Sequence, residues 1–428
     1  MKKQIRLFLV SFCFVFSTAT FAQDAENVRM TLNELCSPGM HGRGYVQHGD
    51  SLAADYIAGR LAAENVLTFN NNFFQDFNFN INTFPNEMQI NIDGVDLVQG
   101  YHFLVDAASK SIKGTYEIAW ADSATIFDKK QFRKFHKHLK KKVIAIDVSS
   151  FRSPESRKKM MSIIYKNRYK AKAIIIVTYG KLTWDAEQTQ LKYARFTIKA
   201  DKINRNSKTI TFNVDAQLVK NYHSRNVIGY IRGSDYPEKY IIISAHYDHL
   251  GMMGKYIFFP GANDNASGVA MMLDFVRMYR FHPPKYTVIF IAFAGEEAGL
   301  IGSKYYVEHP LVPLEKTRFV LNLDLMGTGK NGITVVNGTV FPDEMSVLQM
   351  KEHFGRYHMN IEQRGKAANS DHYWFTQKGV HSFFIYQRGD YTYYHDIFDK
   401  PDQLELEGYT STFYLLRDFL REFQDRHM

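Results

Sequence analysis

Cysteine is nearly absent from this chain of 428 residues, which has only Cys13 and Cys36. Cys13 falls in a leader that we expect to be removed, so the mature chain would keep one thiol and could form no internal disulfide. We expect Cys36 to be a buried, unreactive thiol rather than a nucleophile. Proline is also scarce, with 11 residues, and no low-complexity tract occurs, which argues against long disordered linkers.

The first apolar run, at residues 7–16, is shorter than the ~20 residues that a membrane-spanning helix needs. Basic residues precede it, and Thr20-Phe21-Ala22 follows it with the small residues that signal peptidase reads. We therefore expect residues 1–22 to be a signal peptide. The mature protein would then be periplasmic or secreted, with no stable membrane span.

The chain is basic, with a formal net charge of +9, and removing the three charges of the leader leaves +6. Much of this charge lies in residues 129–142, KKQFRKFHKHLKKK. The run has few aromatic residues placed for base stacking and no nucleic-acid motif, so we expect no nucleic-acid partner. A solvated helix face is the first interpretation, and contact with a polyanion is the second.

The second half of the chain alternates strands and helices. Apolar runs at 240–245, 286–293 and 318–325 are typical of buried strands, and helices are expected at 266–279, 298–307, 343–357 and 408–423. This order predicts an α/β fold of three layers, α/β/α, around a mixed, mostly parallel central sheet.

Residues 95–213 differ from the rest of the chain. Two strand-like runs, 142–148 and 173–177, flank a basic helical stretch, and no catalytic residue types cluster there. We interpret this block as an inserted accessory domain between the N-terminal part of the main domain, 23–94, and the catalytic part, 214–428. Because it carries no candidate ligand, we expect that a short linker could replace it without loss of metal.

Six short segments of the second half are rich in histidine and carboxylate side chains. Five of them supply groups suited to a divalent metal, and the pair of glutamates supplies one further carboxylate. They are Ala245-His246-Tyr247-Asp248, Ala262-Asn263-Asp264-Asn265-Ala266-Ser267-Gly268, Gly295-Glu296-Glu297, Asn322-Leu323-Asp324, Ser370-Asp371-His372 and Tyr394-His395-Asp396. Most of these groups follow expected strands, where α/β sheets bind ligands.

Each candidate also has a structural explanation. Asp264 could be an ordinary helix N-cap, Asp324 could form a salt bridge inside its apolar strand, and His395 could be a satisfied core histidine. His246 with Asp248 could belong to a surface turn. All of these explanations would have to hold together, whereas one metal centre explains the whole set. Two histidines and three to four carboxylates, without cysteine, suit zinc.

Glu296 and Glu297 stand directly after an almost wholly apolar run. Two adjacent carboxylates at a buried position are unfavourable unless a positive group lies near, and a metal supplies one. One glutamate can then be a ligand while the other accepts a proton. A solvated turn is the alternative.

In this order the segments resemble the co-catalytic zinc exopeptidases, which include bacterial leucyl aminopeptidases, glutamate carboxypeptidase and glutaminyl cyclases. The resemblance extends from about residue 226 to the C-terminus and fills every metal position. The block 95–213 is similar to the protease-associated domains of that family. The resemblance also implies a cis peptide bond between Asp264 and Asn265.

The resemblance implies the site roles. One Zn²⁺ would take His246, Asp264 and Asp324, and a second would take Asp264, Glu297 and His395. Glu296 would be the general base, Tyr394 a donor to the oxyanion, and Asp248 a supporting residue around the ligands.

The function expected is that of a secreted aminopeptidase, which removes N-terminal residues from peptides or proteins with metal-activated water. A carboxypeptidase, a dipeptidase and a glutaminyl cyclase on the same scaffold are the alternatives, with a non-catalytic binding protein behind them. Arg364 and Arg388 are candidates to hold the terminal carboxylate of a carboxypeptidase substrate. The sequence indicates no particular oligomeric state.

Overall fold

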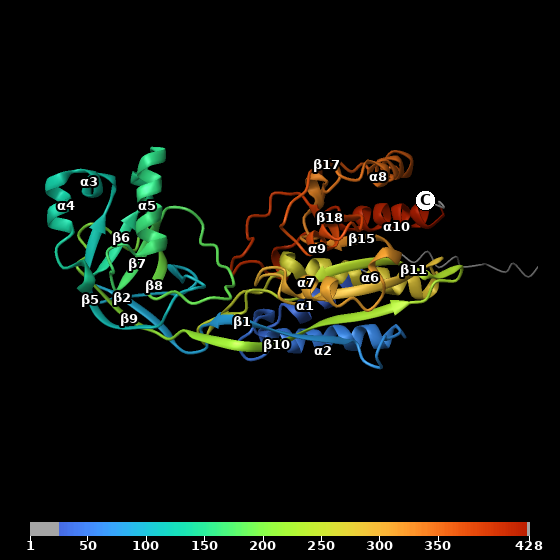
Figure 1. Ribbon diagram of the computed structural model, residues 1–428, viewed down its shortest axis with the longest axis horizontal. Helices are drawn as coiled ribbons and strands as arrows, with labels where there is room; N and C mark the ends of the chain where they lie inside the picture. Colours follow the sequence, from blue (N-terminus) through green and yellow to red (C-terminus); the bar gives the residue numbers. More distant parts are fainter. Residues whose placement is uncertain (1–24, 426–428) are drawn as a thin grey trace, which may run out of the picture.

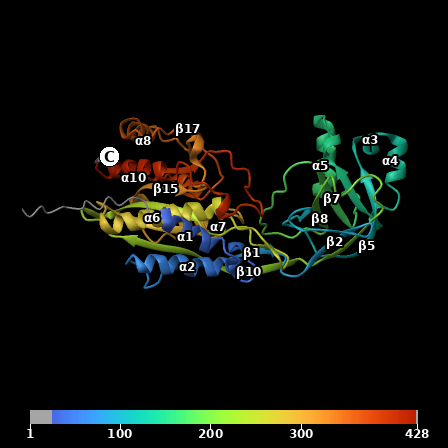
Figure 2. The same cartoon turned by 180° about the vertical axis from the view of Figure 1, so that it is seen from behind.

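The computed structural model describes residues 25–425 and has two lobes, with the segment 88–214 forming the smaller one (Figure 1). The expected signal peptide lies outside the described residues. Within 25–425, no helix has the length and apolar character needed to cross a membrane. The long strands β1 and β10 run between the lobes, and the reverse view shows the same arrangement (Figure 2).

The larger lobe contains an eight-stranded sheet in the order β1-β10-β14-β11-β15-β18-β16-β17. The four central strands, from β14 to β18 in that order, are parallel to one another. The pairs β1–β10, β10–β14 and β16–β18 are antiparallel, and the edge strand β17 is parallel to β16. The strands are β1 (Phe74–Thr83), β10 (Gln217–Ile231), β11 (Tyr236–His246), β14 (Tyr286–Phe293), β15 (Thr317–Leu323), β16 (Ile333–Val336), β17 (Ile361–Arg364) and β18 (Ser382–Gln387).

Helices cover both faces of this sheet because alternate residues of its strands are buried on opposite sides. Ile241 and Ile243 of β11 join a buried cluster with α1, α2, α6, α8 and α10, whereas Ile242 joins a second cluster with α7 and α9. The expected three-layer α/β/α architecture is confirmed. The helices are α1 (Ala25–Leu35), α2 (Gly49–Ala63), α6 (Ser267–Phe281), α7 (Ile301–Glu308), α8 (Pro342–Gly355), α9 (His372–Gln377) and α10 (Tyr409–Asp425).

The smaller lobe is built on a second eight-stranded sheet, in the order β3-β2-β9-β5-β6-β7-β8-β4. Its first strand in the chain, β2, precedes the expected boundary at residue 95. Helices α3 (Ser123–Phe127), α4 (Lys129–Phe135) and α5 (Pro154–Lys166) pack on one face. The strands are β2 (Met88–Ile92), β3 (Val95–Leu97), β4 (Phe103–Val105), β5 (Ile112–Ala121), β6 (Val143–Asp147), β7 (Ala173–Thr178), β8 (Ala194–Lys199) and β9 (Thr209–Val214).

A short hairpin, β12 (Met252–Met253) and β13 (Ile257–Phe258), and several single helical turns complete the described elements. The turns are η1 (Pro38–Arg43), η2 (Leu139–Lys141), η3 (Val148–Ser150), η4 (Ala262–Ala266), η5 (Leu314–Lys316), η6 (Gly329–Asn331) and η7 (Pro401–Gln403).

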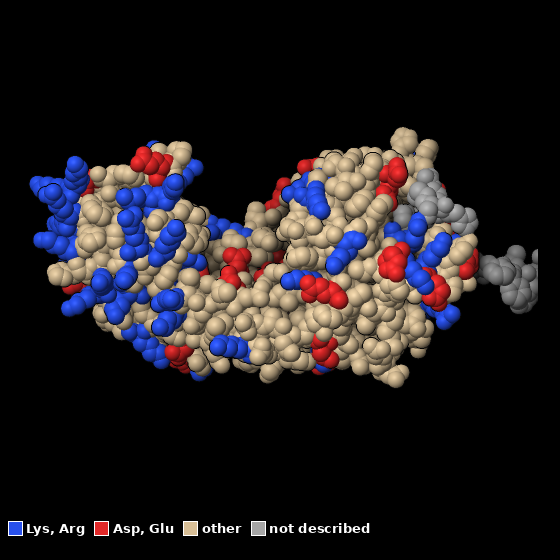
Figure 3. Space-filling view, in the orientation of Figure 1, with Lys and Arg blue, Asp and Glu red and all other residues tan. Residues whose placement is uncertain are grey.

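The two lobes differ in charge. Lys and Arg crowd the surface of the smaller lobe, while acidic groups are visible in the hollow between the lobes (Figure 3). Residues 123–172 carry 16 Lys and Arg against 3 Asp and Glu, so the rest of the chain, whose total is +9, is net acidic. The basic run 129–142 is α-helical only as far as Phe135, with a short helical turn at Leu139–Lys141. Its lysines and Arg133 lie on the surface as a solvated face would.

Arg43 fixes the N-terminal part of the chain to the catalytic half. Its side chain is fully buried and donates hydrogen bonds of 2.6–3.3 Å to five backbone carbonyls. The acceptors are the carbonyl groups of Leu35, Tyr247, Pro260, Gly261 and Asp264. A planar guanidinium can serve so many acceptors at once, whereas an ammonium group has only three donors.

We predict that Arg43→Lys lowers the free energy of unfolding by about 2–4 kcal/mol, because buried carbonyls lose their charged donor. Urea unfolding followed by circular dichroism measures the change. Arg232→Lys, at an exposed position, is the control and should leave the transition in place. Equal midpoints for the two variants would contradict a structural function of the Arg43 fork.

Candidate metal centre

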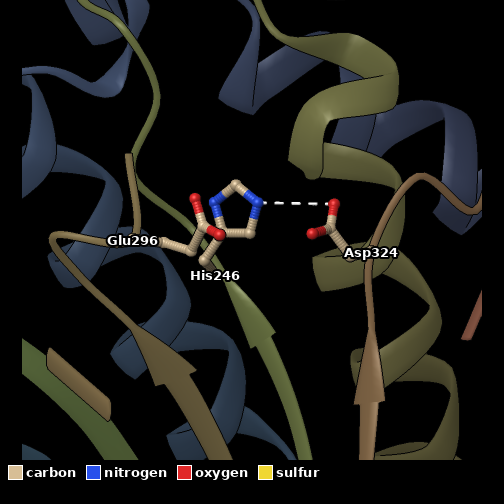
Figure 4. A group of neighbouring side chains, drawn as sticks. All are labelled: His246, Glu296 and Asp324. Carbon is tan, nitrogen blue, oxygen red and sulfur yellow. Dashed lines mark ion pairs between the residues drawn. The ribbon is translucent and has the colours of Figure 1, made fainter. Parts of the chain in front are cut away.

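The candidate ligands meet where neighbouring parallel strands end. His246 is the last residue of β11, Glu296 follows β14, and Asp324 follows β15. Because β14 and β15 flank β11 in the sheet, the three loops open at the same edge. Figure 4 shows the His246 ring between the carboxylates of Glu296 and Asp324. Ligand atoms of these three residues lie within 4.8 Å of one another.

One group of ligand atoms surrounds Nε2 of His246. Oδ1 of Asp264 lies 3.3 Å from it and Oδ1 of Asp324 lies 3.4 Å from it. His246, Asp264 and Asp324 are 1%, 3% and 6% exposed, so water screens these charges little. The structure thus brings together the three residues expected to hold one zinc ion.

A second group surrounds Nε2 of His395. The other oxygen of Asp264, Oδ2, lies 3.2 Å from this nitrogen, and Oε2 of Glu297 lies 3.1 Å from it. Asp264 therefore turns one oxygen to each histidine. This is the geometry in which a single carboxylate can bridge two ions.

Hydrogen bonds at Nδ1 fix the tautomers of both histidines. Nδ1 of His246 donates to the carbonyl of Asp248 at 3.1 Å, and Nδ1 of His395 donates to the carbonyl of Trp184 at 2.7 Å. A carbonyl oxygen can only accept, so both Nδ1 atoms carry hydrogen. In the neutral ring, Nε2 is then left with the lone pair that a metal binds.

The donor set fits zinc. Nε2 of His395 and Oδ1 of Asp324 are buried without a hydrogen-bond partner, although Oε2 of Glu297 lies 3.1 Å from the first and Nε2 of His246 lies 3.4 Å from the second. A lone-pair nitrogen and a carboxylate oxygen are both acceptors, and a cation between them would satisfy both. Separations of 3.1–3.4 Å within each group agree with the edge of a zinc tetrahedron, which is about 3.3 Å for bonds of about 2.0 Å. Nitrogen and carboxylate oxygen are also the donors that zinc accepts.

Glu296 and Glu297 have different electrostatic environments. Burial raises the pKa of Glu296 well above its usual range, against the opposing effect of His246. Burial acts in the same direction on Glu297, but His395 and His249 outweigh it and lower the pKa of Glu297 to about 2. Two carboxyl groups whose pKa values differ in this way can perform different tasks. Glu297 is suited to be the ionised metal ligand, and Glu296 to exchange a proton.

His249 orients Glu297. Its Nδ1 lies 2.6 Å from Oε1 of Glu297, and its side chain is fully buried. His249 is absent from the residues predicted from the sequence, although it directly follows Asp248 in the segment His246-Tyr247-Asp248-His249.

Asp248 supports the two glutamates rather than the ring of His246. Its carboxylate accepts the backbone N–H groups of Glu296 at 3.1 Å and Glu297 at 3.3 Å, and the hydroxyl of Tyr45 at 2.8 Å. Its nearest carboxylate contact with Nδ1 of His246 is 3.8 Å. Asp248 therefore supports the site by holding the loop after β14 against the loop after β11.

The loop that carries Asp264 is held by Asp399. The carboxylate of Asp399 accepts the backbone N–H groups of Asn263 at 2.8 Å and Asp264 at 3.1 Å. The Tyr391 hydroxyl donates to the same carboxylate at 2.6 Å. The peptide bond between Asp264 and Asn265 is cis, as expected.

The segment 370–372 supplies no ligand to either group. Ser370 donates to Oδ2 of Asp324 at 2.9 Å and thereby orients that carboxylate. Asp371 is buried nearby, and burial raises its pKa to about 7. His372 is also buried, and burial lowers its pKa to about 3, so this histidine is a core residue.

Cys36 is a buried free thiol, as expected, and burial raises its pKa to about 12.

A pocket of about 190 Å³ opens onto the first group. Besides ligands and Glu296, it is lined by Leu325, Arg364, Asn369, Phe384, Tyr386 and Tyr394. Tyr394 is 48% exposed and its ring stacks on His395 at 3.9 Å between centroids. Of the two arginines considered, Arg364 lines the pocket, whereas Arg388 forms an ion pair with Glu362 at 3.0 Å.

Residues 226–420 match Peptidase family M28. Among curated proteins, an aminopeptidase of Bacillus subtilis, YwaD, is 38% identical over 110 residues, which cover 25% of this chain and 23% of that protein. A probable zinc metalloprotease of Pyrenophora teres f. teres is 35% identical over 109 residues, covering 24% and 23%. The matches to these relatives thus span less than a quarter of their length.

Solved structures share the fold over almost the whole chain. The zinc aminopeptidase BSAP from Bacillus subtilis aligns with a TM-score of 0.71 and 20% identity, covering 94% of this chain and 95% of that one. An aminopeptidase from Aneurinibacillus sp. strain AM-1 aligns with a TM-score of 0.64 and 22% identity, covering 93% of each. Both lobes are therefore part of a known arrangement.

We predict that the purified protein binds about two equivalents of zinc and that Asp264→Ala loses both, because each group uses one oxygen of Asp264. Metal analysis by mass spectrometry after dialysis measures the content. Asp390→Ala, at an exposed position, is the control. Retention of two equivalents by Asp264→Ala would contradict the bridging position of this carboxylate.

Proposed function

We propose that this chain, which belongs to peptidase family M28 through residues 226–420, is a zinc-dependent aminopeptidase that acts outside the cytoplasm. The observation that carries the proposal is the division of the Asp264 carboxylate between two histidine and carboxylate groups, with Glu296 beside them. The extracytoplasmic location is supported by the leader-like residues 1–22.

The residues that would hold zinc are His246, Asp264 and Asp324 for one ion, and Asp264, Glu297 and His395 for the other. Two zinc ions, when bound, would supply positive charge that polarises the peptide carbonyl and makes water more acidic. The remaining chemistry belongs to side chains of this chain.

Glu296 accepts a proton from the attacking water and passes it to the amine that leaves, as a general base and then a general acid. Its backbone is fixed by the carboxylate of Asp248, which keeps its side chain over the first group of ligands. Tyr394 borders the same pocket and donates a hydrogen bond to the carbonyl oxygen as negative charge develops there.

An aminopeptidase is favoured over a carboxypeptidase by the residues around the pocket. A terminal carboxylate is best held by paired cationic groups. Here Arg364 is the one arginine among the pocket-lining residues, and it donates to the Tyr386 hydroxyl at 3.0 Å. The carboxylates of Asp264, Glu296 and Asp324 line the pocket and can attract the ammonium group of a substrate. The named relatives include aminopeptidases. Arg364 keeps a carboxypeptidase or dipeptidase as the second candidate, whereas the complete second group argues against a cyclase that uses one zinc ion.

We predict that Glu296→Gln lowers turnover by about 10²- to 10⁴-fold while metal content is unchanged, because the amide cannot accept the proton. Glu297→Gln should lose one zinc equivalent, because a charged ligand is removed. Parallel measurements of activity and metal content separate the two variants. If Glu296→Gln loses metal and Glu297→Gln keeps it, the assignments of the two residues are reversed.

We predict that the protein cleaves chromogenic aminoacyl amides and that chelator abolishes the reaction. Blocking the substrate amine by acetylation should remove activity, because the aminopeptidase reaction requires a free N-terminus. Peptides with a blocked N-terminus and a free C-terminus test the second candidate in the same assay. Cleavage of those peptides alone would replace the aminopeptidase proposal with a carboxypeptidase.

A further inference from the structure

The smaller lobe sends one segment, residues 181–188, into the catalytic lobe. The segment lies between β7, which ends at Thr178, and β8, which begins at Ala194. These residues belong to the block 95–213, which carries no candidate ligand and was expected to be dispensable for metal binding. Their contacts connect that block to the loops that carry two of the candidate ligands.

The backbone of Trp184 forms hydrogen bonds with both the backbone and the imidazole ring of His395. The backbone N–H of Trp184 donates to the His395 carbonyl at 3.2 Å, and Nδ1 of His395 donates to the Trp184 carbonyl at 2.7 Å. The second bond selects the tautomer that leaves Nε2 free for metal. Asp185 adds an acceptor 3.2 Å from the same Nδ1, but its side chain is 74% exposed and contributes less.

Lys181 holds the loop that leads to His395. Its Nζ donates to the carbonyl of Thr392 at 2.6 Å and also to the carbonyl of Tyr394. These carbonyls stand three residues and one residue before His395, so the lysine fixes the backbone from which the imidazole projects.

Trp184 is anchored by contacts with both lobes. Its indole N–H donates to the carbonyl of Val105 in β4 at 2.6 Å, and its ring stacks on Phe259 at 4.8 Å between centroids. The side chain is 5% exposed. The position of the Trp184 carbonyl is therefore set by a buried side chain that Val105 of the smaller lobe and Phe259 of the larger lobe hold in place.

The same segment also reaches the loop of the other ligand in the second group. Nε2 of Gln188 donates to the carbonyl of Ala298, which directly follows Glu297. Within the described chain, the hydrogen bonds of residues 181–188 to the catalytic half go to the loops that carry His395 and Glu297.

We infer that residues 181–188 are a structural part of the second metal site, and that Lys181 and Trp184 act as positioning residues for His395. This inference rests on the proposed two-metal centre. The smaller lobe thereby determines affinity for the second zinc ion, while the group around His246 is assembled within the catalytic lobe. Outer groups that orient metal-binding histidines change metal affinity by about 10- to 100-fold when they are removed.

The test is zinc titration of Lys181→Met in the full chain, by competition with a chromophoric chelator. Methionine keeps the length of the side chain but cannot donate to the two carbonyls. We expect the second zinc equivalent to bind about 10- to 100-fold more weakly and the first to bind as in the wild type. Lys192→Met, at an exposed position in the same lobe, is the control and should match the wild type.

Trp184→Phe provides a second variant that keeps an aromatic ring and removes the anchor to Val105. It should also weaken the second equivalent selectively. Wild-type affinity for both equivalents in both variants would overturn the inference while leaving the two-metal centre intact, and so would an equal loss of both equivalents. A wild-type protein that binds only one equivalent would overturn the two-metal centre first, and this inference with it.

Discussion

Repulsion among buried carboxylates is the constraint on which this site depends. Asp264, Glu297 and Asp324 place their oxygens within a few ångströms of two imidazoles, at positions from which water is largely excluded. Such a cluster is unfavourable without positive charge between its members. The surrounding hydrogen bonds are arranged around this constraint. Nε2 of both imidazoles faces the carboxylates. The carboxylates of Asp248 and Asp399 accept backbone N–H groups instead of adding to this cluster.

The parallel sheet makes this concentration of charge feasible. The carboxyl ends of parallel strands lie at one edge of the sheet, so the loops that follow them are neighbours. Residues far apart in sequence therefore meet there through short loops. Ile241, Ile242 and Ile243 of β11 fill the two faces of the sheet, and His246 ends the same strand. The apolar core thus supplies a rigid base for the polar site.

Much of this arrangement could be predicted from the sequence, because its signals are local. The buried strands are continuous apolar runs, and Glu296, Glu297 and Asp324 stand out as charges beside or within them. The groups that position the ligands could not be predicted in the same way. The acceptor of His395 is a backbone carbonyl, which any residue at position 184 would carry. Arg43 is one of many basic residues of the chain, and its residue type does not show that its side chain is buried. Such contacts depend on which residues the tertiary fold brings together, and residue type alone does not predict them.

The spread of the site along the chain has a consequence for biosynthesis. The two groups of ligands need residues from His246 to His395, the N-terminal segment closes over them through Arg43, and the smaller lobe adds Trp184. A chain that is still being made, and that ends between residues 324 and 395, carries the whole first group and the bridging Asp264 but lacks His395 of the second group. The complete pair of ligand groups therefore forms only after residue 395 of the 428 has been synthesised, so metal could enter both groups only late in biosynthesis.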